Sequence, residues 1–479
     1  MSALRCAPRV AVFLGLFAAI CAAAHGAERP NFVFIVTDDQ GPWAMHAAGD
    51  PNAVTPNLDR LRASGAMLTR CYSPTPVCSP ARASILTSRY GTELGITDYL
   101  PRSDPPLKGL SPEIATWPRA LSEAGYSTAL VGKYHCGELA ESHPTRIGYG
   151  EFSGFIHGGM VSKDPLMEID GVERQMSGWT PDLLTDYAID FLQRKQDASF
   201  ALSLHFWAPH ANAGVNEEGD RTWLPLSEAD LTPFADLDPQ LPEPDFPKLD
   251  HPRTKRMLRE YLASVHSVDR NVGRVLDTLD ELGLAEKTVV IMTSDHGYNL
   301  GHHGIWHKGN GRWLLIDDQG DRANMWDNSL RVPAIVRWPG VIRAGATIDQ
   351  TCSHLDWFPT ILGMAGVEMP QDAVVRGRTL VPLLKGESPP WSEELFAQYR
   401  MREDSGEGAD MRSYQTDRWK LVRFQRQRRE DEFYDRVSDP EEKTNLIEST
   451  DPEVRQAISE LQAKMVSRMS EIGDRVVAE

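Results

Sequence analysis

The sequence predicts an α/β protein whose large, mostly parallel sheet lies between layers of helices, followed by a smaller C-terminal α+β subdomain. Short apolar runs alternate with segments of helical periodicity, which is the pattern of a sheet buried on both faces. Polar residues that suit catalysis or metal binding follow the ends of several of these runs. After about residue 384 the pattern changes to short strands and one long helix.

The first strand is expected at residues 31–36 (NFVFIV), a run rich in β-branched and aromatic residues. A helix is expected to follow, because Thr55 is a capping residue, Pro56 suits the first turn and Gly65 suits the end. A second helix is expected just before Gly125.

Further strands are expected at residues 126–131 (YSTALV), 200–204 (FALSL), 288–292 (TVVIM) and 332–336 (VPAIV). The longest helix is expected from about Met257 to Leu282, because apolar residues recur there at helical spacing. Strands and helices therefore alternate, which favours parallel pairing with helical crossovers.

Polar pairs lie just after the C-terminal ends of four expected strands. They are Asp38 with Asp39, Lys133 with His135, His205 with His210, and Asp295 with His296. In open α/β sheets this edge is where ligands bind. The topology therefore predicts that these residues, which are far apart in the sequence, meet in one site.

The chain is longer than one typical hydrophobic core, so two units are expected. Residues 28–384 are expected to form a large α/β domain that carries these polar residues, and residues 385–479 are expected to form the subdomain with a small antiparallel sheet and a terminal helix. Residues 212–252, which are rich in Pro, Asp and Glu, are expected to form a surface excursion near the site.

Residues 1–27 are expected to be a secretory signal peptide. Basic Arg5 and Arg9 precede a short apolar run, and small alanines lead to a cleavage site after Ala24 or Ala27. We therefore expect export to a periplasmic, extracellular or lumenal compartment. No apolar run reaches the roughly 18–20 residues that span a bilayer, so no transmembrane segment is expected.

The formal net charge of −18 excludes nucleic acid as the expected partner, although a small anionic substrate can still bind a locally basic site. Six cysteines are present, and four of them follow the expected signal peptide. If Cys78 is used for chemistry, at most one disulfide can form among Cys71, Cys136 and Cys352.

The adjacent carboxylates Asp38 and Asp39 repel each other at a strand end unless a cation lies between them. A lone Asp-Asp pair is more often a solvated turn, but the Asp295-His296 pair at another strand end favours a metal site. Three carboxylates suit a hard divalent ion, Ca²⁺ before Mg²⁺. His296 is a softer donor and leaves the identity of the metal open.

Residues 78–82 (CSPAR) match the C-x-P-x-R signature of the formylglycine-dependent sulfatases, in the alkaline phosphatase superfamily, and the chain resembles that family. Other family motifs occur in the family's order, before that signature at residues 38–39 (DD) and after it at residues 86–90 (LTSRY), 132–135 (GKYH), 208–210 (APH), 294–297 (SDHG) and 307–309 (HKG). One short motif is weak, but several in order are strong.

The resemblance implies that a formylglycine-generating enzyme oxidises Cys78 to formylglycine, an aldehyde that hydrates to a geminal diol. One diol oxygen would bind a single divalent cation together with Asp38, Asp39, Asp295 and His296. The implied reaction is hydrolysis of a sulfate monoester, on a small molecule or a glycan, to an alcohol and inorganic sulfate.

The resemblance also implies roles for the cationic side chains. Arg82 would stabilise the ionised diol, and Lys133 would lie beside it. His135 would be the base for the elimination of sulfate. His210 and Lys308 would bind the sulfate oxygens and the leaving oxygen.

The chain departs from the usual family pattern at two motif positions, because Ala81 replaces a serine and His296 replaces an asparagine. His205 lies outside the Pro-His pair that contains His210, so we expect His205 to be structural. We also expect Asp327 and Arg331 to form an internal salt bridge rather than to take part in catalysis.

Two alternatives stay open: a phosphonate or phosphodiester hydrolase with the same modified cysteine, or an inactive relative that binds sulfated glycans. A sulfated carbohydrate is the favoured substrate of an exported sulfatase. The chain also departs from the family pattern beside Lys308, in the run at residues 301–307 (GHHGIWH) and the insertion at residues 310–323. This loop is expected to line the leaving-group pocket, with Trp306 or Trp313 either stacked on a sugar face or structural.

Overall fold

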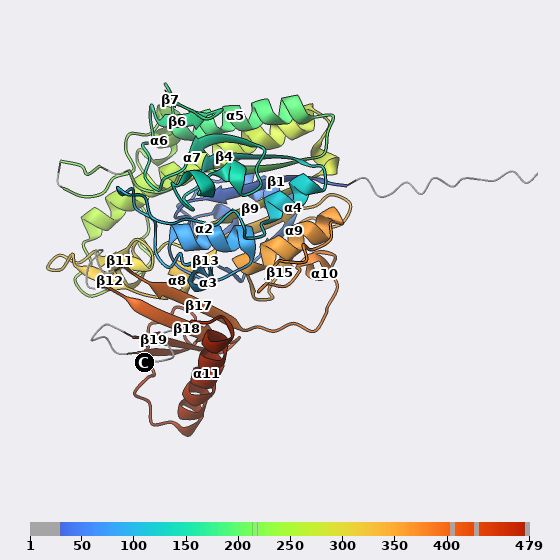
Figure 1. Ribbon diagram of the computed structural model, residues 1–479. Coiled ribbons are helices and arrows are strands. Elements are labelled where there is room, and N and C mark those ends of the chain that lie inside the picture. The colour runs from blue at the N-terminus through green and yellow to red at the C-terminus, as the bar shows by residue number, and fades with distance from the viewer. Residues whose placement is uncertain (1–28, 213, 218, 403–407, 426–430, 475–479) are drawn as a thin grey trace, which may run out of the picture.

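The computed structural model describes residues 29–212, 214–217, 219–402, 408–425 and 431–474. The expected signal peptide lies outside these ranges, so its cleavage stays a prediction. The described chain forms a large α/β unit with a smaller unit near its C-terminal end (Figure 1).

A ten-stranded sheet forms the centre of the large unit. Its strands, in spatial order, are β15 (Ala346–Ile348), β2 (Ala66–Leu68), β14 (Ala334–Arg337), β9 (Thr288–Ser294), β1 (Asn31–Thr37), β8 (Phe200–His205), β4 (Ser127–Lys133), β5 (Glu151–Phe155), β6 (Leu166–Ile169) and β7 (Val172–Gln175). The five strands from β9 to β5 pair in parallel, whereas β14, β6 and β7 run antiparallel to their neighbours. The predicted mostly parallel sheet is therefore confirmed.

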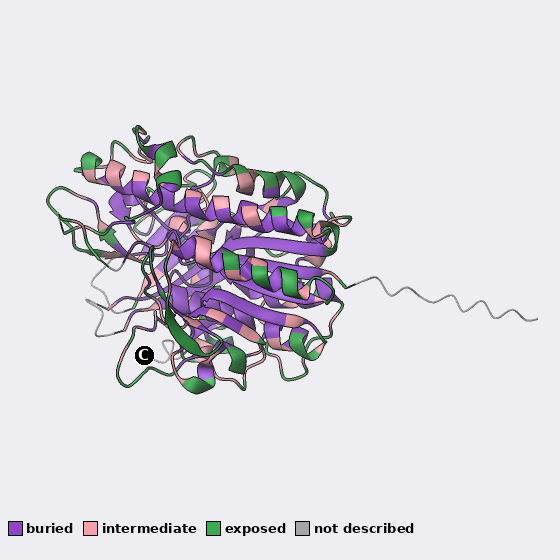
Figure 2. Cartoon of the chain, turned by 90° about the horizontal axis from the view of Figure 1, so that it is seen from above, coloured by how far each residue is buried: buried purple, intermediate pink, exposed green. Residues whose placement is uncertain are grey.

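Both faces of the sheet are buried, as the continuous apolar runs predicted. Along β1, Phe32 and Phe34 pack into one hydrophobic cluster, whereas Val33 and Ile35 pack into another on the opposite face. Successive side chains alternate because a strand has a period of two residues. In Figure 2 the central strands are buried, and the helices above them are buried mainly on their inner sides.

Helices cover both faces of the sheet (Figure 1). One face packs against α1 (Pro56–Ser64), α5 (Thr180–Lys195) and α7 (His251–Glu281), and the other against α2 (Cys78–Thr87), α4 (Trp117–Glu123) and α9 (Trp357–Ala365). The long helix α7 begins before the expected Met257, because Pro252 lies in its first turn and Asp250 accepts a hydrogen bond from the backbone N–H of Arg253. The short helices are α3 (Gly91–Leu94), α6 (Glu228–Leu231), α8 (Asp327–Leu330) and α10 (Val381–Leu384).

One expected strand is divided in the structure. Residues 332–336 contribute to both β13 (Arg331–Val332) and β14, with Pro333 between them. β13 pairs with β3 (Cys71–Tyr72), outside the main sheet. Proline has no backbone N–H to donate, so the hydrogen-bond ladder is interrupted at Pro333.

β3 also pairs in parallel with β16 (Cys352–Ser353), which places Cys71 directly opposite Cys352. The structure has Cys71, Cys78, Cys136 and Cys352 as buried free thiols. Cys136 lies against the backbone carbonyls of Ser79 and Tyr134. At most one disulfide could form among Cys71, Cys136 and Cys352. Because paired strands lie about 4.8 Å apart, a spacing that a disulfide can span, Cys71 and Cys352 are the pair best placed for it.

The smaller unit is a four-stranded antiparallel sheet covered by one helix. Its elements are β17 (Leu395–Arg400), β18 (Asp410–Gln415), β19 (Trp419–Phe424), β20 (Glu432–Asp435) and α11 (Pro452–Glu471). Buried Arg412 of β18 pairs with Asp410 and with Asp474, which follows α11. The expected boundary after residue 384 falls between α10 and β17, and it stays a prediction.

The expected salt bridge between Asp327 and Arg331 is wrong. Among the described residues, the Asp327 carboxylate pairs with Lys420 at 2.9 Å and with Arg436 at 2.8 Å. Both cations belong to the small unit, which packs close to α8, whereas Arg331 already lies in β13. The pairing therefore ties the small unit to the large one.

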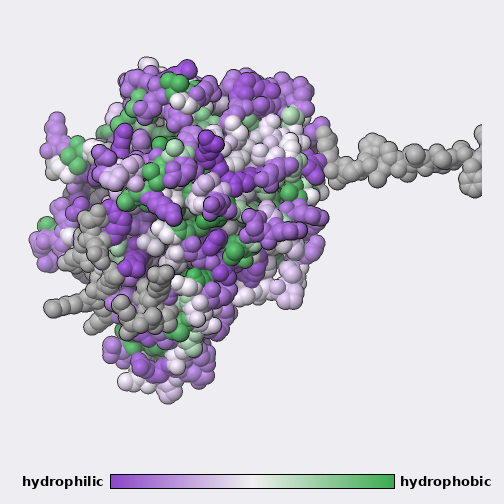
Figure 3. All heavy atoms as spheres, viewed as in Figure 1, coloured by the Kyte–Doolittle hydropathy of each residue, from purple (hydrophilic) through white to green (hydrophobic). Residues whose placement is uncertain are grey.

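Within the described ranges, no helix combines the length and apolar character that crossing a membrane requires. Hydrophilic side chains cover most of the face in Figure 3, and hydrophobic residues form small scattered groups there. This surface is consistent with a chain that is a quarter charged residues.

Candidate active site

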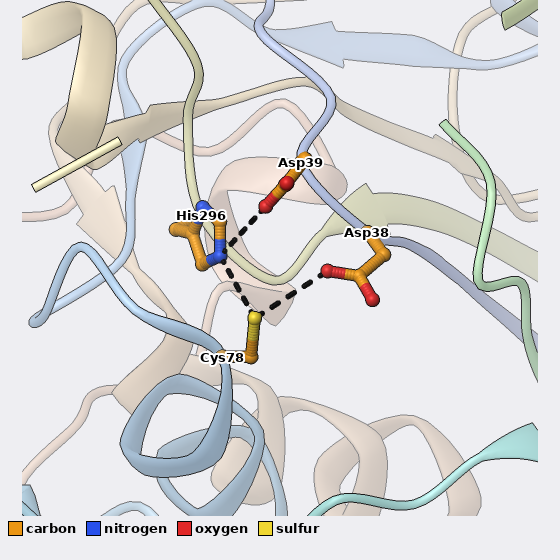
Figure 4. Close-up of side chains that lie close together, drawn as sticks. All are labelled: Asp38, Asp39, Cys78 and His296. Carbon is orange, nitrogen blue, oxygen red and sulfur yellow. Dashed lines mark hydrogen bonds and ion pairs between the residues drawn. The ribbon is translucent and has the colours of Figure 1, made fainter. Parts of the chain in front are cut away.

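The polar residues that follow the strand ends meet at the carboxyl edge of the central sheet. Asp38 and Asp39 follow β1, and Asp295 and His296 follow β9. Lys133 ends β4 and His135 comes shortly after it, whereas His210 lies in the turn after β8. The first turn of α2 brings Cys78 into the same cluster (Figure 4). The arrangement that the strand pattern predicted is therefore present.

Close packing of β4 against β8 places Lys133. Gly132 has φ +111°, and a Cβ atom there would lie 1.9 Å from the carbonyl oxygen of His205. Only glycine allows this approach without strain. The glycine beside Lys133 is thus required by the strand packing that presents the lysine to the site.

Cys78 is the first residue of α2, and its side chain is buried. Its Sγ lies 3.0 Å from Lys308 Nζ, 3.4 Å from His296 Nε2 and 3.5 Å from Asp38 Oδ1. Burial raises the pKa of the Cys78 thiol, and the Asp38 carboxylate raises it further. An unmodified thiol here is a weak nucleophile at neutral pH, because the thiolate is the reactive form.

The donor atoms of Asp38, Asp39, Cys78 and His296 all lie within 4.8 Å of one another, and all four residues are buried (Figure 4). Asp295 adjoins them, with its Oδ1 3.4 Å from His296 Nε2. Asp39 Oδ2 has no hydrogen-bond partner among the described residues. Buried carboxylates are costly without a counterion, and this oxygen-rich set with one histidine fits a divalent cation.

Hydrogen bonds orient the groups that would hold the cation. His296 donates its Nδ1–H to the carbonyl of Gly297 at 2.9 Å, which leaves the Nε2 lone pair facing the cluster. Asp295 Oδ1 accepts the backbone N–H groups of Asp39 and His296, at 3.3 and 3.0 Å. These bonds hold the imidazole and the carboxylate in place before any ion binds.

Buried cations balance the carboxylates. Lys133 Nζ donates to Asp38 Oδ2. Lys308 Nζ donates to Asp39 Oδ1 at 2.5 Å. Burial alone would raise the pKa of Asp39, but the positive charge of Lys308, with His210, outweighs burial and holds the pKa below its usual range. The carboxylates are therefore ionised at neutral pH.

Arg82 lies one helical turn after Cys78 and is also buried. Its guanidinium donates to Asp295 Oδ2 and to the Lys133 carbonyl, each at 3.0 Å, and lies 3.6 Å from Asp38 Oδ2. Arg82 thus positions two of the carboxylates. Its expected direct contact with an ionised diol stays a prediction.

His135 and His210 each present one unprotonated nitrogen. His135 Nε2 donates to the carbonyl of Leu100 at 2.9 Å, so Nδ1 is the basic atom, and it has no partner among the described residues. Burial lowers the pKa of His135 well below its usual value, and Lys133 lowers it further. His210 Nδ1 donates to the carbonyl of Ala211 at 2.7 Å, and its Nε2 lies 3.7 Å from Asp39 Oδ2.

His205 lies behind the site, at the end of β8. Its Nδ1 lies 3.2 Å from the carbonyl oxygen of Lys133, so the imidazole supports the backbone of β4. Burial lowers the pKa of His205 to about 3. This environment agrees with a structural role.

We expect the substitution His205→Gln to remove part of the pH dependence of stability. The pKa of His205 is about 3 in the folded protein and 6.5 when unperturbed, so the neutral imidazole contributes stability that is present above pH 6.5 and lost as the pH falls toward 3. Glutamine does not titrate. The stability difference between wild type and variant should therefore shrink by up to about 1.4 kcal/mol per pH unit below the unperturbed pKa.

Urea unfolding of both proteins at about pH 7 and about pH 5 measures this change. A difference in unfolding free energy that is the same at both pH values would show that His205 is not held neutral by burial.

A cavity of about 710 Å³ opens over Cys78. The catalytic candidates that line it are Lys133, His135, His210 and Lys308. Much of the remaining wall is apolar and includes Tyr99, Leu100, Pro101, Met160 and Val161. Such a wall suits the nonpolar face of a sugar or an aromatic ring.

The excursion at residues 212–252 reaches this cavity through Arg221, in agreement with its expected place near the site. The segment on both sides of Lys308 forms a small sheet of β10 (Ile305–Trp306), β11 (Asn310–Trp313) and β12 (Asp321–Ala323). It contributes His307 and Asn310 to the cavity wall.

Trp306 and Trp313 do not line this cavity, so their stacking on a substrate stays a prediction. Neither ring is among the described residues that line it. Trp306 is buried in a hydrophobic cluster and borders only a smaller adjoining cavity. Trp313 packs near Phe246, with the ring centres 6.5 Å apart. The packing of both rings within the folded segment favours the structural alternative.

Residues 30–367 match the protein-family model described as Sulfatase, and residues 318–471 match the model described as N-sulphoglucosamine sulphohydrolase, C-terminal. The first match covers well over half of the chain. The chain belongs to the sulfatase family. It is a sulfuric ester hydrolase, as the sequence motifs implied.

Relatives of known activity are also sulfatases. This sulfatase is 29% identical to the N-acetylglucosamine-6-O-sulfatase of Bacteroides thetaiotaomicron, over 88% of this chain and 83% of the relative. It is 30% identical to the steryl-sulfatase of Homo sapiens, over 81% and 75% of the two chains. It is 28% identical to the ulvan-active sulfatase of Formosa agariphila, over 93% and 82%.

Solved structures share the fold. A protein in complex with its substrate D-glucosamine-2-N,6-O-disulfate has a TM-score of 0.79 and 25% identity to this sulfatase, over 93% of this chain and 98% of that one. The phosphonate monoester hydrolase of Silicibacter pomeroyi has a TM-score of 0.68 and 21% identity, over 94% and 97%. The second likeness shows the fold alone.

His157 lines the cavity of this sulfatase although no motif in the sequence pointed to it. His307 and Asn310 also line the cavity, and both belong to the segments expected beside Lys308, although neither had a role of its own. His307 directly precedes Lys308, and that adjacency was the available signal. His157 follows β5, a strand that the sequence pattern did not reveal.

Proposed function

We propose that this sulfatase removes sulfate from a carbohydrate sulfate monoester, with formylglycine at position 78 as the nucleophile. The observation that carries the proposal is the place of Cys78, whose Sγ lies among the metal-site residues, 3.0 Å from Lys308 Nζ, on the wall of the cavity. Sγ stands where an oxygen of the hydrated aldehyde would lie.

Conversion of Cys78 is an oxidation of its Cβ from CH₂–SH to CHO. The C–S bond breaks and sulfur leaves as hydrogen sulfide, while one C–H bond is replaced by the C=O bond. A formylglycine-generating enzyme would catalyse the step, with dioxygen as the oxidant and an external thiol as the source of the two further electrons; the second oxygen atom becomes water. Addition of water to the aldehyde then gives the diol.

The diol avoids the need to place a water molecule at sulfur. One hydroxyl loses its proton and attacks the sulfur of the ester, and the S–O bond to the alcohol breaks as that oxygen takes up a proton. The second hydroxyl then loses its proton and forms C=O, which breaks the C–O bond and releases inorganic sulfate. Rehydration of the aldehyde consumes one water molecule and completes the turnover.

Each step has a candidate residue of this chain. His135 Nδ1, unprotonated and without a partner among the described residues, would accept the proton of the second hydroxyl. Lys133 and Lys308 would bind sulfate oxygens with their positive charges. Lys308 would polarise or protonate the leaving oxygen, together with His210 when the Nε2 of its imidazole carries a proton.

We propose Ca²⁺ as the cation, held by Asp38, Asp39, Asp295, His296 and an oxygen of the modified residue 78. Oxygen donors outnumber the single imidazole, which favours Ca²⁺ over softer metals. When bound, the cation would neutralise the carboxylates and lower the pKa of the neighbouring hydroxyl.

Two relatives whose names specify sugar sulfates, together with the mixed polar and apolar cavity wall, support a carbohydrate as the substrate class.

We also propose that the chain is exported, because Arg5, Arg9 and the following apolar run form a signal-peptide pattern. A mature N-terminus at residue 25 or 28, read by mass spectrometry, would support this.

The experiment that tests the proposed function compares substrates. The protein, produced together with a formylglycine-generating enzyme, is assayed on 4-nitrophenyl sulfate, on a panel of sulfated hexoses and N-acetylhexosamines, and on a phosphonate monoester. The proposal expects the highest kcat/KM on one sulfated sugar. Preference for the phosphonate would favour the alternative hydrolase, and binding of sulfated glycans without turnover would favour the inactive relative.

We expect Lys133→Ala and His210→Ala each to lower kcat/KM for the preferred sulfate ester by roughly 100-fold, because each removes one charge-stabilising or proton-transferring group. Steady-state kinetics measure the loss, and metal analysis and melting temperature check that the site still assembles. Near wild-type activity in either variant would remove that residue from the mechanism.

A further inference from the structure

His307 is a cavity residue to which the reaction itself assigns no role. It lies directly before Lys308 and lines both the catalytic cavity and the smaller adjoining one, of about 270 Å³. Lys308 Nζ is 3.0 Å from Cys78 Sγ, so the imidazole is next to the group that contacts the reacting position. A substrate that fills the first cavity and extends toward the second passes this side chain.

The backbone of His307 is held in an unusual conformation. Its φ is +80°, in the left-handed region that favours glycine. The backbone N–H and the side-chain N–H of Asn299 both donate to its carbonyl, at 3.0 and 2.8 Å. Such strain persists where the surrounding structure enforces it, often at functional sites.

One hydrogen bond sets which ring nitrogen of His307 carries the hydrogen and which bears the lone pair. Nδ1 lies 2.7 Å from Asn310 Oδ1, and an amide oxygen can only accept, so Nδ1 carries the hydrogen. Nε2 then bears the lone pair. Burial, with the charge of Lys308, lowers the pKa of His307 to about 3, so the ring stays neutral at physiological pH.

An acceptor in this place selects for a hydrogen-bond donor on the substrate. A sugar carries hydroxyl or amide N–H groups beside its sulfated position, whereas 4-nitrophenyl sulfate has no donor. A site that hydrogen-bonds a substrate OH or NH discriminates strongly against an analogue that lacks it, because the polar group is left unpaired.

We propose that His307 is a specificity-determining residue whose Nε2 accepts a hydrogen bond from a hydroxyl or amide N–H next to the sulfated position of a carbohydrate. This inference rests on the proposed carbohydrate sulfatase function. It assigns His307 to recognition of the leaving group, and not to the chemical step.

The test compares two matched variants, His307→Gln and His307→Met. Glutamine and methionine are both unbranched, and each would have to adopt the same backbone conformation at position 307. Only glutamine keeps a strong hydrogen-bond acceptor. Each protein is assayed on 4-nitrophenyl sulfate, on the sulfated monosaccharide that the wild type cleaves fastest, and on the deoxy analogues of that sugar. The measured quantity is the ratio of kcat/KM for sugar to kcat/KM for the aryl sulfate, which cancels losses common to both substrates.

We expect methionine to lower this ratio by about 10- to 100-fold and glutamine to restore most of it. For one deoxy analogue, the ratio of its kcat/KM to that for the aryl sulfate should be about the same in the wild type and in the methionine variant. That analogue lacks the hydroxyl or amide N–H group that His307 would bind. An unchanged ratio in the methionine variant, or equal loss in both variants, would overturn the assignment of His307 alone. A wild type that cleaves the aryl sulfate but no sulfated sugar would overturn the carbohydrate proposal, and this inference with it.

Discussion

Replacing Cys78 by alanine should abolish sulfate ester hydrolysis and leave the fold intact. The variant keeps Cβ but lacks the thiol whose oxidation gives the aldehyde, so neither attack on sulfur nor elimination of sulfate can occur, and we expect kcat to fall by roughly 10,000-fold or more. Alanine suits the first turn of α2, and the lost thiol hydrogen bonds are weak, so the melting temperature should change little. Turnover of the preferred sulfate ester and thermal unfolding measure the two effects.

Cys78→Ser is the matched control, because serine supplies one hydroxyl at the same Cβ. A single hydroxyl can take the sulfuryl group but cannot expel it by forming C=O, so we expect at most one equivalent of alcohol per protein and a sulfated serine. In the wild type, mass spectrometry of the peptide that contains Cys78 should show a loss of about 18 Da, the change from thiol to aldehyde. Multiple turnovers by the alanine variant would refute the role of residue 78.

Removing the metal should abolish activity and destabilise the protein. Asp38, Asp39 and Asp295 are buried together, and without a cation their mutual repulsion is offset only by the neighbouring cationic side chains. We expect a chelator to lower kcat by roughly 1,000-fold or more and to lower the melting temperature, because an ion that binds only the folded state stabilises it. Added Ca²⁺ should restore both quantities.

The substitution Asp39→Asn tests the role of the metal by removing one of its expected ligands. The variant loses one carboxylate and should copurify with less metal and show activity as low as the chelated enzyme. Asp269→Asn is a suitable control, because Asp269 is also buried but accepts hydrogen bonds from the backbone at the start of α1. It should lose stability and keep its metal content. Full activity in metal-free wild type would remove the cation from the mechanism.

Much of the architecture could be predicted from local patterns. Continuous apolar runs, as in β1 and β9, identified strands buried on both faces, and capping and periodicity identified α1 and α7. The helix α2 was not predicted, since Pro80 and two nearby serines obscure its apolar face. Residues 332–336 were predicted as one strand, but the partners that divide it at Pro333 come from distant segments.

The cluster of candidate catalytic residues was predictable for a topological reason. Parallel strands end at one edge, so polar residues after β1, β4, β8 and β9 had to meet there. The placement of Trp306 and Trp313 was not predictable, because an aromatic residue in a loop can face a cavity or the core. The partners of Asp327 were not predictable either, because they lie in the other unit of the protein.

The sequence by itself determined the family, the residue to be modified and the set of groups around it, because these depend on residue types in a fixed order along the chain. Only the tertiary structure decided which nitrogen of His135, His210 and His307 carries the proton, since hydrogen bonds to Leu100, Ala211 and Asn310 set it. Those bonds join side chains to partners whose distance and direction exist only once the backbone is folded. The order of residues therefore predicted which reactive groups are present. It did not predict which nitrogen of each histidine carries the hydrogen.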